Sequence, residues 1–174
     1  DDRSAFDAKS RELAAQLVTS LTNESGIWAG FMPIGFEPDI SSIFSSLQYL
    51  TWAFPRVEGE TLAFYVPMGA LVLNHWDIPE PDPSASRKIP LGDLRGILVP
   101  GLAFDLQCNR LGRGRGFYDR VLGRPEIHTN TNLVKVGIGF ERQIASSPLP
   151  TDPHDQAMDR IITESREIKR TESK

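Results

Sequence analysis

The segment at residues 109–119 constrains the fold of this chain more than any other. It reads Asn-Arg-Leu-Gly-Arg-Gly-Arg-Gly-Phe-Tyr-Asp, so glycines alternate with arginines in a chain that is acidic overall. Glycines at alternate positions do not pack a core. They allow close approach of the backbone, or φ angles that other residues avoid. Residues 117–122 favour a helix, and the apolar run at residues 96–101 favours a buried strand. The sequence therefore predicts a strand, a long loop, a glycine–arginine loop at residues 110–116, and a helix.

The glycine–arginine loop has the features of an anion site. A loop that runs into a helix N-terminus presents free N–H groups and the positive end of the helix dipole, which suits phosphate. The loop lacks the Gly-Lys-Ser/Thr ending of a Walker A motif, and its G-x-G-x-G spacing does not match the dinucleotide fingerprint. The alternative is a flexible, charged surface loop. The arginines favour the anion site, because guanidinium groups bind phosphate in a bidentate manner.

Two segments together resemble the signature of a known family. Residues 99–105 read V-P-G-L-A-F-D, and residues 109–119 follow with N-R-L-G-R-G-R-G-F-Y-D. This resembles the 5-formyltetrahydrofolate cyclo-ligase family, also called methenyltetrahydrofolate synthetases, whose pattern is V-P-G-x-x-F-D and then R-L-G-x-G-x-G-Y-Y-D. Phe117 stands at the first tyrosine of the usual pair, which keeps the ring and loses one hydroxyl. The resemblance extends over roughly residues 10–163.

The resemblance implies an ATP-dependent ligase that also needs Mg²⁺. The implied reaction closes 5-formyltetrahydrofolate to 5,10-methenyltetrahydrofolate and releases ADP and phosphate. In the family's mechanism the formyl oxygen attacks the γ-phosphate, and the substrate's own N10 then attacks the phospho-imidate. Such chemistry needs no protein nucleophile, because positioning and charge neutralisation supply most of the catalysis.

The resemblance also assigns roles to individual residues. It implies that Asp119 and Asp155 hold Mg²⁺, and that Glu37, Trp76 and Tyr118 bind the folate substrate. We expect Arg113, Arg115 and Tyr118 to be the catalytic residues. The expected ATP-binding residues are Arg110, Leu111, Gly112, Arg113, Gly114, Arg115, Gly116, Phe117 and Tyr118.

Without the resemblance, several of these residues have simpler interpretations. Glu37 would be a solvated loop carboxylate, since charged residues are mostly exposed, and Trp76 would be a core aromatic. Asp155 would be a turn residue. Cys108 lies beside the glycine–arginine loop, but a reactive thiol needs a depressed pKa. The three histidines are scattered and lack metal-ligand spacing.

Net charge, the length of apolar runs and the cysteine count limit the class of protein that this chain can be. The 174 residues carry a net charge of −4, which argues against a general nucleic-acid surface. No apolar run reaches the ~18 residues that a membrane span needs. The single cysteine excludes an internal disulfide and fits a reducing compartment. We expect a cytoplasmic monomer that binds folate and ATP, with no nucleic-acid or membrane partner. The chain begins at Asp1 and not at Met, so we keep as an alternative that a leader such as an organellar transit peptide has been removed.

Apolar periodicity outlines the elements. It predicts a helix over residues 4–21, and strands at residues 27–32, 51–56, 61–66, 70–73, 133–140 and 158–163. Asp39 is expected to cap a second helix, residues 79–88 to form a surface loop, and residues 164–174 a frayed tail. We therefore expect one cyclo-ligase-like α/β domain over residues 1–174. In this three-layer domain, helices flank a mostly parallel sheet and the ligand cleft lies at the strand C-terminal ends.

One departure from the family pattern bears on function. The family usually opens with a further helix that carries a K-x-x-x-R motif for ATP phosphates, whereas Lys9-Ser10-Arg11 lacks that spacing. We expect that the chain starts after this helix, or that it is a relative without it. The alternative function is then a cyclo-ligase-like protein that binds nucleotide or pterin without turnover. A plain interaction module would leave the glycine–arginine loop unexplained.

Overall fold

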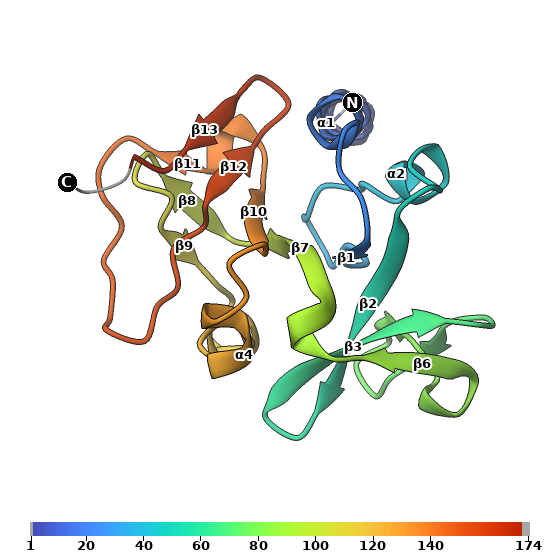
Figure 1. The fold of residues 1–174 in the computed structure, drawn as a ribbon. Coiled ribbons are helices and arrows are strands. Elements are labelled where there is room, and N and C mark those ends of the chain that lie inside the picture. The colour runs from blue at the N-terminus through green and yellow to red at the C-terminus, as the bar shows by residue number, and fades with distance from the viewer. Residues whose placement is uncertain (1, 172–174) are drawn as a thin grey trace.

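A computed structural model describes residues 2–171, and an eight-stranded sheet runs through its centre (Figure 1). The strand order across the sheet is β13-β12-β10-β7-β1-β2-β3-β6. The strands are β1 (Ile27–Ala29), β2 (Thr51–Glu58), β3 (Thr61–Pro67), β6 (Ser86–Ile89), β7 (Leu94–Pro100), β10 (Val134–Ile138), β12 (Arg160–Ile162) and β13 (Glu167–Lys169).

The five central strands β12, β10, β7, β1 and β2 are parallel to one another. Antiparallel strands close both edges, with β3 and β6 at one side and β13 at the other. Parallel strands need connections that cross a face of the sheet, so helices cover both faces. This arrangement confirms the predicted α/β fold with a mainly parallel sheet.

The helices form the two outer layers. On one face lie α1 (Asp2–Leu21) and α2 (Ser42–Ser46), and on the other lie α3 (Phe117–Leu122) and α4 (Pro125–His128); Figure 1 shows α1 and α2 on the side of the sheet opposite α4. Leu13, Leu17 and Leu21 of α1 are fully buried, because they recur on one side of the helix. The opposite core includes Val121 and Leu122 of α3.

Smaller elements lie outside this sheet. A two-stranded hairpin pairs β4 (Val72–Leu73) with β5 (Pro79–Glu80), and a three-stranded sheet joins β11 (Ile144–Ala145), β8 (Ala103–Asp105) and β9 (Arg110–Leu111). Three single turns of 3-10 helix complete the described elements, at Pro83–Ala85, Leu91–Asp93 and Glu141–Gln143.

Three local predictions were wrong. The second helix begins at Ser42, and Asp39 instead accepts hydrogen bonds from the backbone and hydroxyl of Ser41. The expected loop at residues 79–88 contains β5, which pairs with β4, and the first residues of β6, which pair with the edge of β3. The expected frayed tail contains β13, whose Ile168 packs into the core opposite β12. Its last residues, 172–174, lie outside the described part of the chain.

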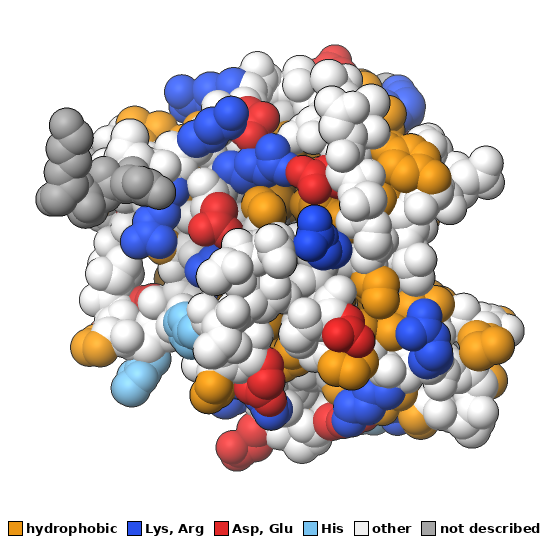
Figure 2. Space-filling view, in the orientation of Figure 1, with side chains coloured by type: hydrophobic (Ala, Val, Ile, Leu, Met, Phe, Trp, Pro, Cys, Tyr) orange, Lys and Arg blue, Asp and Glu red, His pale blue; other side chains and the backbone are white. Residues whose placement is uncertain are grey.

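Charged side chains of both signs are interspersed on the face of the molecule seen in Figure 2. Charged side chains of the protein also form ion pairs, among them Lys9 with Glu164 and Arg166 with Glu141. These pairs connect α1, the end of β10 and the β12–β13 turn. Within residues 2–171, no helix has the length and apolar character that crossing a bilayer requires.

Trp28 and Gly96 make a close contact between the two central strands β1 and β7, next to a shift in their register. Trp28 on β1 pairs with Gly96 on β7, and its fully buried indole lies across the glycine. A Cβ atom added at Gly96 would lie 2.3 Å from the Trp28 ring, far closer than van der Waals contact. Glycine is therefore the residue that this pairing tolerates.

We predict that Gly96→Ala destabilises the fold by about 1–3 kcal/mol, because the new methyl group forces the Trp28 ring out of its packing. Urea denaturation followed by circular dichroism measures this change. Gly92→Ala is the matched control, since nothing lies within 4 Å of its Cβ position, and it should shift stability by less than about 0.5 kcal/mol. Equal stability of the two variants would contradict the packing argument.

Candidate active site

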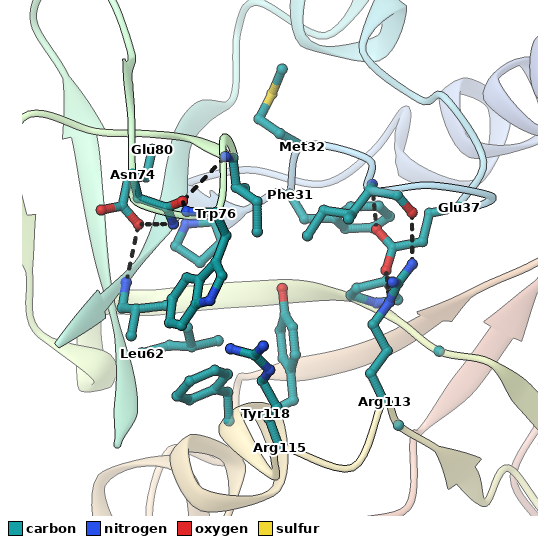
Figure 3. A pocket seen from close by; sticks show the side chains of 18 of the residues that line it. Phe31, Met32, Glu37, Leu62, Asn74, Trp76, Glu80, Arg113, Arg115 and Tyr118 are labelled. Carbon is teal, nitrogen blue, oxygen red and sulfur yellow. Dashed lines mark hydrogen bonds and ion pairs between the residues drawn. The ribbon is translucent and has the colours of Figure 1, made fainter. Parts of the chain in front are cut away.

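A cavity of about 360 Å³ opens at the C-terminal ends of β1 and β7 (Figure 3). These two strands are neighbours in the sheet but far apart in sequence: the chain adds β2 beyond β1 on one side and returns to place β7 on the other. Loops that leave such a reversal point diverge, and open α/β sheets bind ligands in the crevice between them. The cavity therefore lies where the fold class predicts a ligand site.

Six segments form the walls of this cavity. The loop after β1 contributes residues that include Glu37, the β4–β5 hairpin contributes Trp76, the end of β7 contributes Pro100, and strands β2 and β3 contribute Val57 and Leu62. The sixth is the glycine–arginine loop with the start of α3. Of its nine expected ATP-binding residues, seven line the cavity, whereas Leu111 and Gly114 do not: Arg110, Gly112, Arg113, Arg115, Gly116, Phe117 and Tyr118.

The glycines of the loop serve its backbone conformation. Gly114 and Gly116 have φ angles of 88° and 68°, in the left-handed region that favours glycine. At Gly112, a Cβ atom would lie 3.0 Å from the Arg110 guanidinium. The helix that follows, α3, has only six residues. Its dipole is correspondingly short, so the positive charge of the loop comes mainly from the arginine side chains.

Glu37 and Arg113 form an ion pair at one side of the cavity, 76 residues apart in sequence. Arg113 Nε donates to Glu37 Oε1 at 3.1 Å, and its Nη2 donates to the Ile34 carbonyl at 2.6 Å. Ile34 N–H donates to Glu37 Oε2 at 2.9 Å. Glu37 is 7% exposed, and this burial raises its pKa above the ordinary value, although Ile34 and Arg113 partly offset the rise. The donors from Ile34 and Arg113 therefore do not fully offset the cost of burying the charged Glu37 carboxylate.

Trp76 and Arg115 stack on each other across the cavity. The Arg115 guanidinium lies 4.5 Å from the centroid of the Trp76 ring, within the range of a cation–π contact. Trp76 is 37% exposed, so it is not the core aromatic that its residue type alone indicates. In Figure 3, Trp76, Arg115 and Tyr118 point toward one another in the middle of the site.

Tyr118 is held as a neutral phenol. Burial is the main cause that raises its pKa well above the ordinary value, and the Glu37 carboxylate adds to the rise. The Arg110 guanidinium lies 5.6 Å from its ring centroid. Its hydroxyl points into the cavity (Figure 3), where a neutral phenol can donate a hydrogen bond.

The two aspartates expected at a metal both make protein contacts. Asp119 Oδ2 lies 3.2 Å from Nη2 of Arg110, and Asp119 Oδ1 accepts from Gln156 N–H at 3.3 Å. Asp155 Oδ2 accepts from Asp152 N–H at 2.7 Å. The Gln156 contact brings the neighbouring Asp155 segment to α3. Among residues 2–171, no group of three or more His, Cys, Asp or Glu side chains is arranged for a metal ion.

Arg110 is the best buried of the loop arginines, at 4% side-chain exposure. Its Nη1 donates to the Pro100 carbonyl at 3.0 Å, and its Nη2 binds Asp119. Arg110 therefore connects the end of β7 to α3, in addition to lining the cavity. By contrast, the side chain of Arg113 is 44% exposed.

Sequence reasoning missed the role of Asp105. This fully buried carboxylate accepts hydrogen bonds from Gln107 N–H, from both the backbone and side chain of Asn109, and from Leu149 N–H. It holds the segment before the glycine–arginine loop against residues 144–149. An aspartate followed by polar residues two and four positions later is a signal of such a turn.

Sequence reasoning also missed Asn74 and Glu80, which lie in the cavity wall on the Trp76 side. Cys108 lacks the depressed pKa of a reactive thiol: burial raises the pKa of its thiol to about 11, and its Sγ contacts the Ile168 carbonyl. Its φ of 64° places it in a tight turn.

The fold and cavity define an α/β protein whose cavity lies where a mainly parallel sheet reverses its strand order. The sequence profile of the 5-formyltetrahydrofolate cyclo-ligase family matches residues 8–164. The chain belongs to this family.

Known proteins with similar sequences and structures carry the same family name or its synonym. The probable 5-formyltetrahydrofolate cyclo-ligase of Schizosaccharomyces pombe is 36% identical over 108 residues, which cover 58% of this chain and 52% of that protein. The Mus musculus 5-formyltetrahydrofolate cyclo-ligase is 37% identical over 91 residues, covering 51% and 44%. The chain thus spans about half the length of these relatives. The solved 5,10-methenyltetrahydrofolate synthetase of Aquifex aeolicus matches with a TM-score of 0.73 at 26% identity, covering 94% of this chain and 84% of that one.

We predict that Asp105→Asn lowers stability at pH 7 by about 2–3 kcal/mol, because an amide nitrogen would face the N–H donors that the carboxylate now accepts. Burial alone would raise the pKa of Asp105, but the hydrogen bonds from Asn109, Leu149 and Gln107 outweigh it and lower the pKa. The stabilisation is therefore present above the unfolded pKa of about 4 and is lost as pH falls through the lower folded value.

Urea denaturation of the wild type and Asp105→Asn between pH 7 and pH 3 measures this difference. The gap between the two proteins should shrink as the pH falls. Asp93→Asn, at an exposed carboxylate, is the control and should change stability little at any pH. A gap that stays constant down to pH 3 would show that the charge of Asp105 is not what stabilises the turn.

Proposed function

We propose that this chain catalyses the ATP- and Mg²⁺-dependent cyclisation of 5-formyltetrahydrofolate to 5,10-methenyltetrahydrofolate, with release of ADP and phosphate. The observation that carries the proposal is the meeting of Glu37, Trp76, Tyr118 and two arginines in one cavity, at the strand-order reversal of a cyclo-ligase family fold. The names of the Aquifex aeolicus and Schizosaccharomyces pombe relatives support the substrate class.

Glu37 and Trp76 suit the pterin end of a folate. A pterin ring presents neighbouring N–H groups, and a carboxylate can accept a pair of such hydrogen bonds. Each Glu37 oxygen has a protein donor but retains acceptor capacity, and the raised pKa of this carboxyl shows that further donors would stabilise its charge. The flat Trp76 ring supplies an apolar surface on which the pterin packs.

Arg113 and Arg115 suit the phosphates of ATP. Both line the cavity, and the side chain of Arg113 is partly exposed, so each guanidinium is accessible to a ligand. Charge neutralisation by arginines is the main catalytic demand of phosphoryl transfer, and the described site offers it without a nucleophile. The neutral Tyr118 hydroxyl is placed to hydrogen-bond the reacting substrate, which is the role we assign to it.

The donor set fits a magnesium site that substrate phosphates complete. Mg²⁺ binds through one or two carboxylates together with phosphate oxygens and waters, so a dedicated protein cage is not required. Asp119 is at the start of α3 and its neighbour in space, Gln156, follows Asp155 directly. Asp119 and Asp155 would hold the ion, which neutralises phosphate charge when bound. Asp119 would share its carboxylate with Arg110, so Asp155 is the sharper test.

The proposal is tested by mixing the chain with 5-formyltetrahydrofolate and Mg-ATP and following the absorbance of the methenyl product. Product should form only when folate, ATP and Mg²⁺ are all present. A chain that binds both ligands in calorimetry without forming product would instead be the non-catalytic relative, and a chain that binds neither would contradict both functions.

Glu37→Gln should weaken 5-formyltetrahydrofolate binding by about 10–100-fold, the effect of losing hydrogen bonds to a charged group, and should change ATP binding far less. Isothermal titration calorimetry with each ligand separately measures both constants. Glu12→Gln, an exposed residue of α1, is the matched control and should alter neither. An equal loss of both ligands would show that the substitution acts on the fold.

Asp155→Asn should raise the Mg²⁺ concentration needed for turnover and reduce the thermal stabilisation by Mg-ATP, while leaving the ligand-free melting temperature nearly unchanged. Asp119→Asn should show the same ligand effects and also lower the ligand-free melting temperature, because it breaks the ion pair with buried Arg110. The double variant should cost less than the sum of the single ones. Intact turnover in Asp155→Asn would rule out the shared metal.

A further inference from the structure

The Trp76 hairpin, residues 72–80, is a separate two-stranded unit beside the central sheet. Its strands β4 and β5 are two residues long, and Trp76 lies at its tip, over the cavity. A hairpin this short is not stable alone, because isolated two-stranded ribbons are marginal in water. Its position therefore depends on side chains that attach it to the body of the protein.

Glu80 makes that attachment to strand β2. Its carboxylate is buried, with 5% of the residue exposed, and Oε1 lies 2.8 Å from Nη1 of Arg56. Oε2 accepts from Val57 N–H at 3.4 Å and from Asn74 Nδ2 at 3.2 Å. Arg56 and Val57 belong to β2, which the sheet holds in place. One carboxylate thus connects the rigid sheet to the start of the hairpin tip.

Asn74 sets the shape of the tip. Its Oδ1 accepts from the backbone N–H groups of Trp76 at 2.9 Å and Ile78 at 3.1 Å, and its own N–H donates to the Ile78 carbonyl at 3.0 Å. Asp77 adopts the left-handed conformation with φ of 58°. The chain of contacts therefore runs from Arg56 through Glu80 and Asn74 to the backbone of Trp76.

Burying the charged Glu80 side chain costs free energy, and other residues could close the hairpin at a lower cost. Taking a charge out of water is unfavourable unless it is paired and hydrogen-bonded, and a turn needs no such group. The buried Glu80 carboxylate is explained if it holds the Trp76 ring against the cavity, because a displaced binding residue loses much of its effect. Figure 3 shows Asn74 and Glu80 together at the Trp76 side of the site.

We propose that Glu80 and Asn74 are positioning residues that hold Trp76 over the cavity, and that they affect substrate binding through Trp76. The substrate named here, 5-formyltetrahydrofolate, rests on the proposed function. The positioning itself does not, because it concerns the ligand-free protein.

The first measurement is acrylamide quenching of tryptophan fluorescence in the ligand-free protein. Trp28 and Trp52 are buried, so the accessible emission comes mainly from Trp76. Glu80→Gln keeps the size of the side chain and removes its charge, and Asn74→Ala removes the tip contacts with the Arg56–Glu80 pair intact. Both should steepen the quenching. Glu58→Gln, which removes another ion pair from β2, the one with Lys88, should not.

The second measurement is steady-state kinetics with each substrate varied. Glu80→Gln should raise KM for 5-formyltetrahydrofolate about tenfold, because a displaced Trp76 ring packs less well on the substrate, and change kcat less. In a Trp76→Ala background the same substitution should add little, because residues that act through one another are non-additive.

The outcomes separate the two proposals. Steeper quenching without folate binding or turnover in any protein would uphold the positioning and overturn the proposed function. A raised KM with unchanged quenching, or full additivity with Trp76→Ala, would show direct ligand contact and overturn the positioning. Unchanged quenching and KM in folded Glu80→Gln would also overturn it. If thermal melts show that Glu80→Gln does not fold, the quenching of Asn74→Ala decides.

Discussion

The reversal of strand order between β1 and β7 is the constraint on which the rest of the structure depends. The chain first builds outward from β1 through β2, β3 and β6, and then returns to add β7 on the other side of β1. Trp28 can pack across β7 because Gly96 leaves it room. The two strands therefore stay close while their following loops separate. The cavity lies in that separation, and Glu37, Trp76, Tyr118 and most residues of the glycine–arginine loop line it.

Two buried carboxylates show the difference between a structural and a ligand-binding environment. Burial alone would raise the pKa of Asp105, but hydrogen bonds from the turn at residues 107–109 and from Leu149 outweigh it, so the pKa is lowered. Glu37 has one backbone donor and one arginine, and burial prevails, so its pKa is raised. The first site is complete without a ligand. The second retains a charge that more donors would stabilise, which is typical of functional sites.

The sequence predicted the parts of the structure whose signals are long or conformationally strict. α1 is 20 residues long, and its leucines at positions 13, 17 and 21 recur at helical spacing. Gly114 and Gly116 have the positive φ angles that favour glycine. The resemblance placed Glu37, Trp76 and Tyr118 in one site, and the cavity brings them together. Whether they bind folate stays a prediction.

The sequence failed where elements are short or partners distant. β5 has two residues and β13 has three, too few to show a period of two. Partnerships such as Glu80 with Arg56, or Arg113 with Glu37, depend on tertiary proximity that no local pattern encodes. The loop at residues 79–88 had the composition of a turn, but pairing with β3 made its last residues a strand.

The three arginines of the glycine–arginine loop show that the spacing of a motif does not predict the role of each side chain in it. They share one motif, yet Arg110 faces the protein interior and connects Pro100 to Asp119, while Arg113 and Arg115 reach the cavity from a backbone bent by glycines. The buried Arg110 guanidinium is held by its protein partners and therefore cannot readily move with a phosphate during a reaction. An accessible one can exchange a protein partner for a ligand. The same residue type thus supports the walls of the site at one position and offers charge to its contents at the other two.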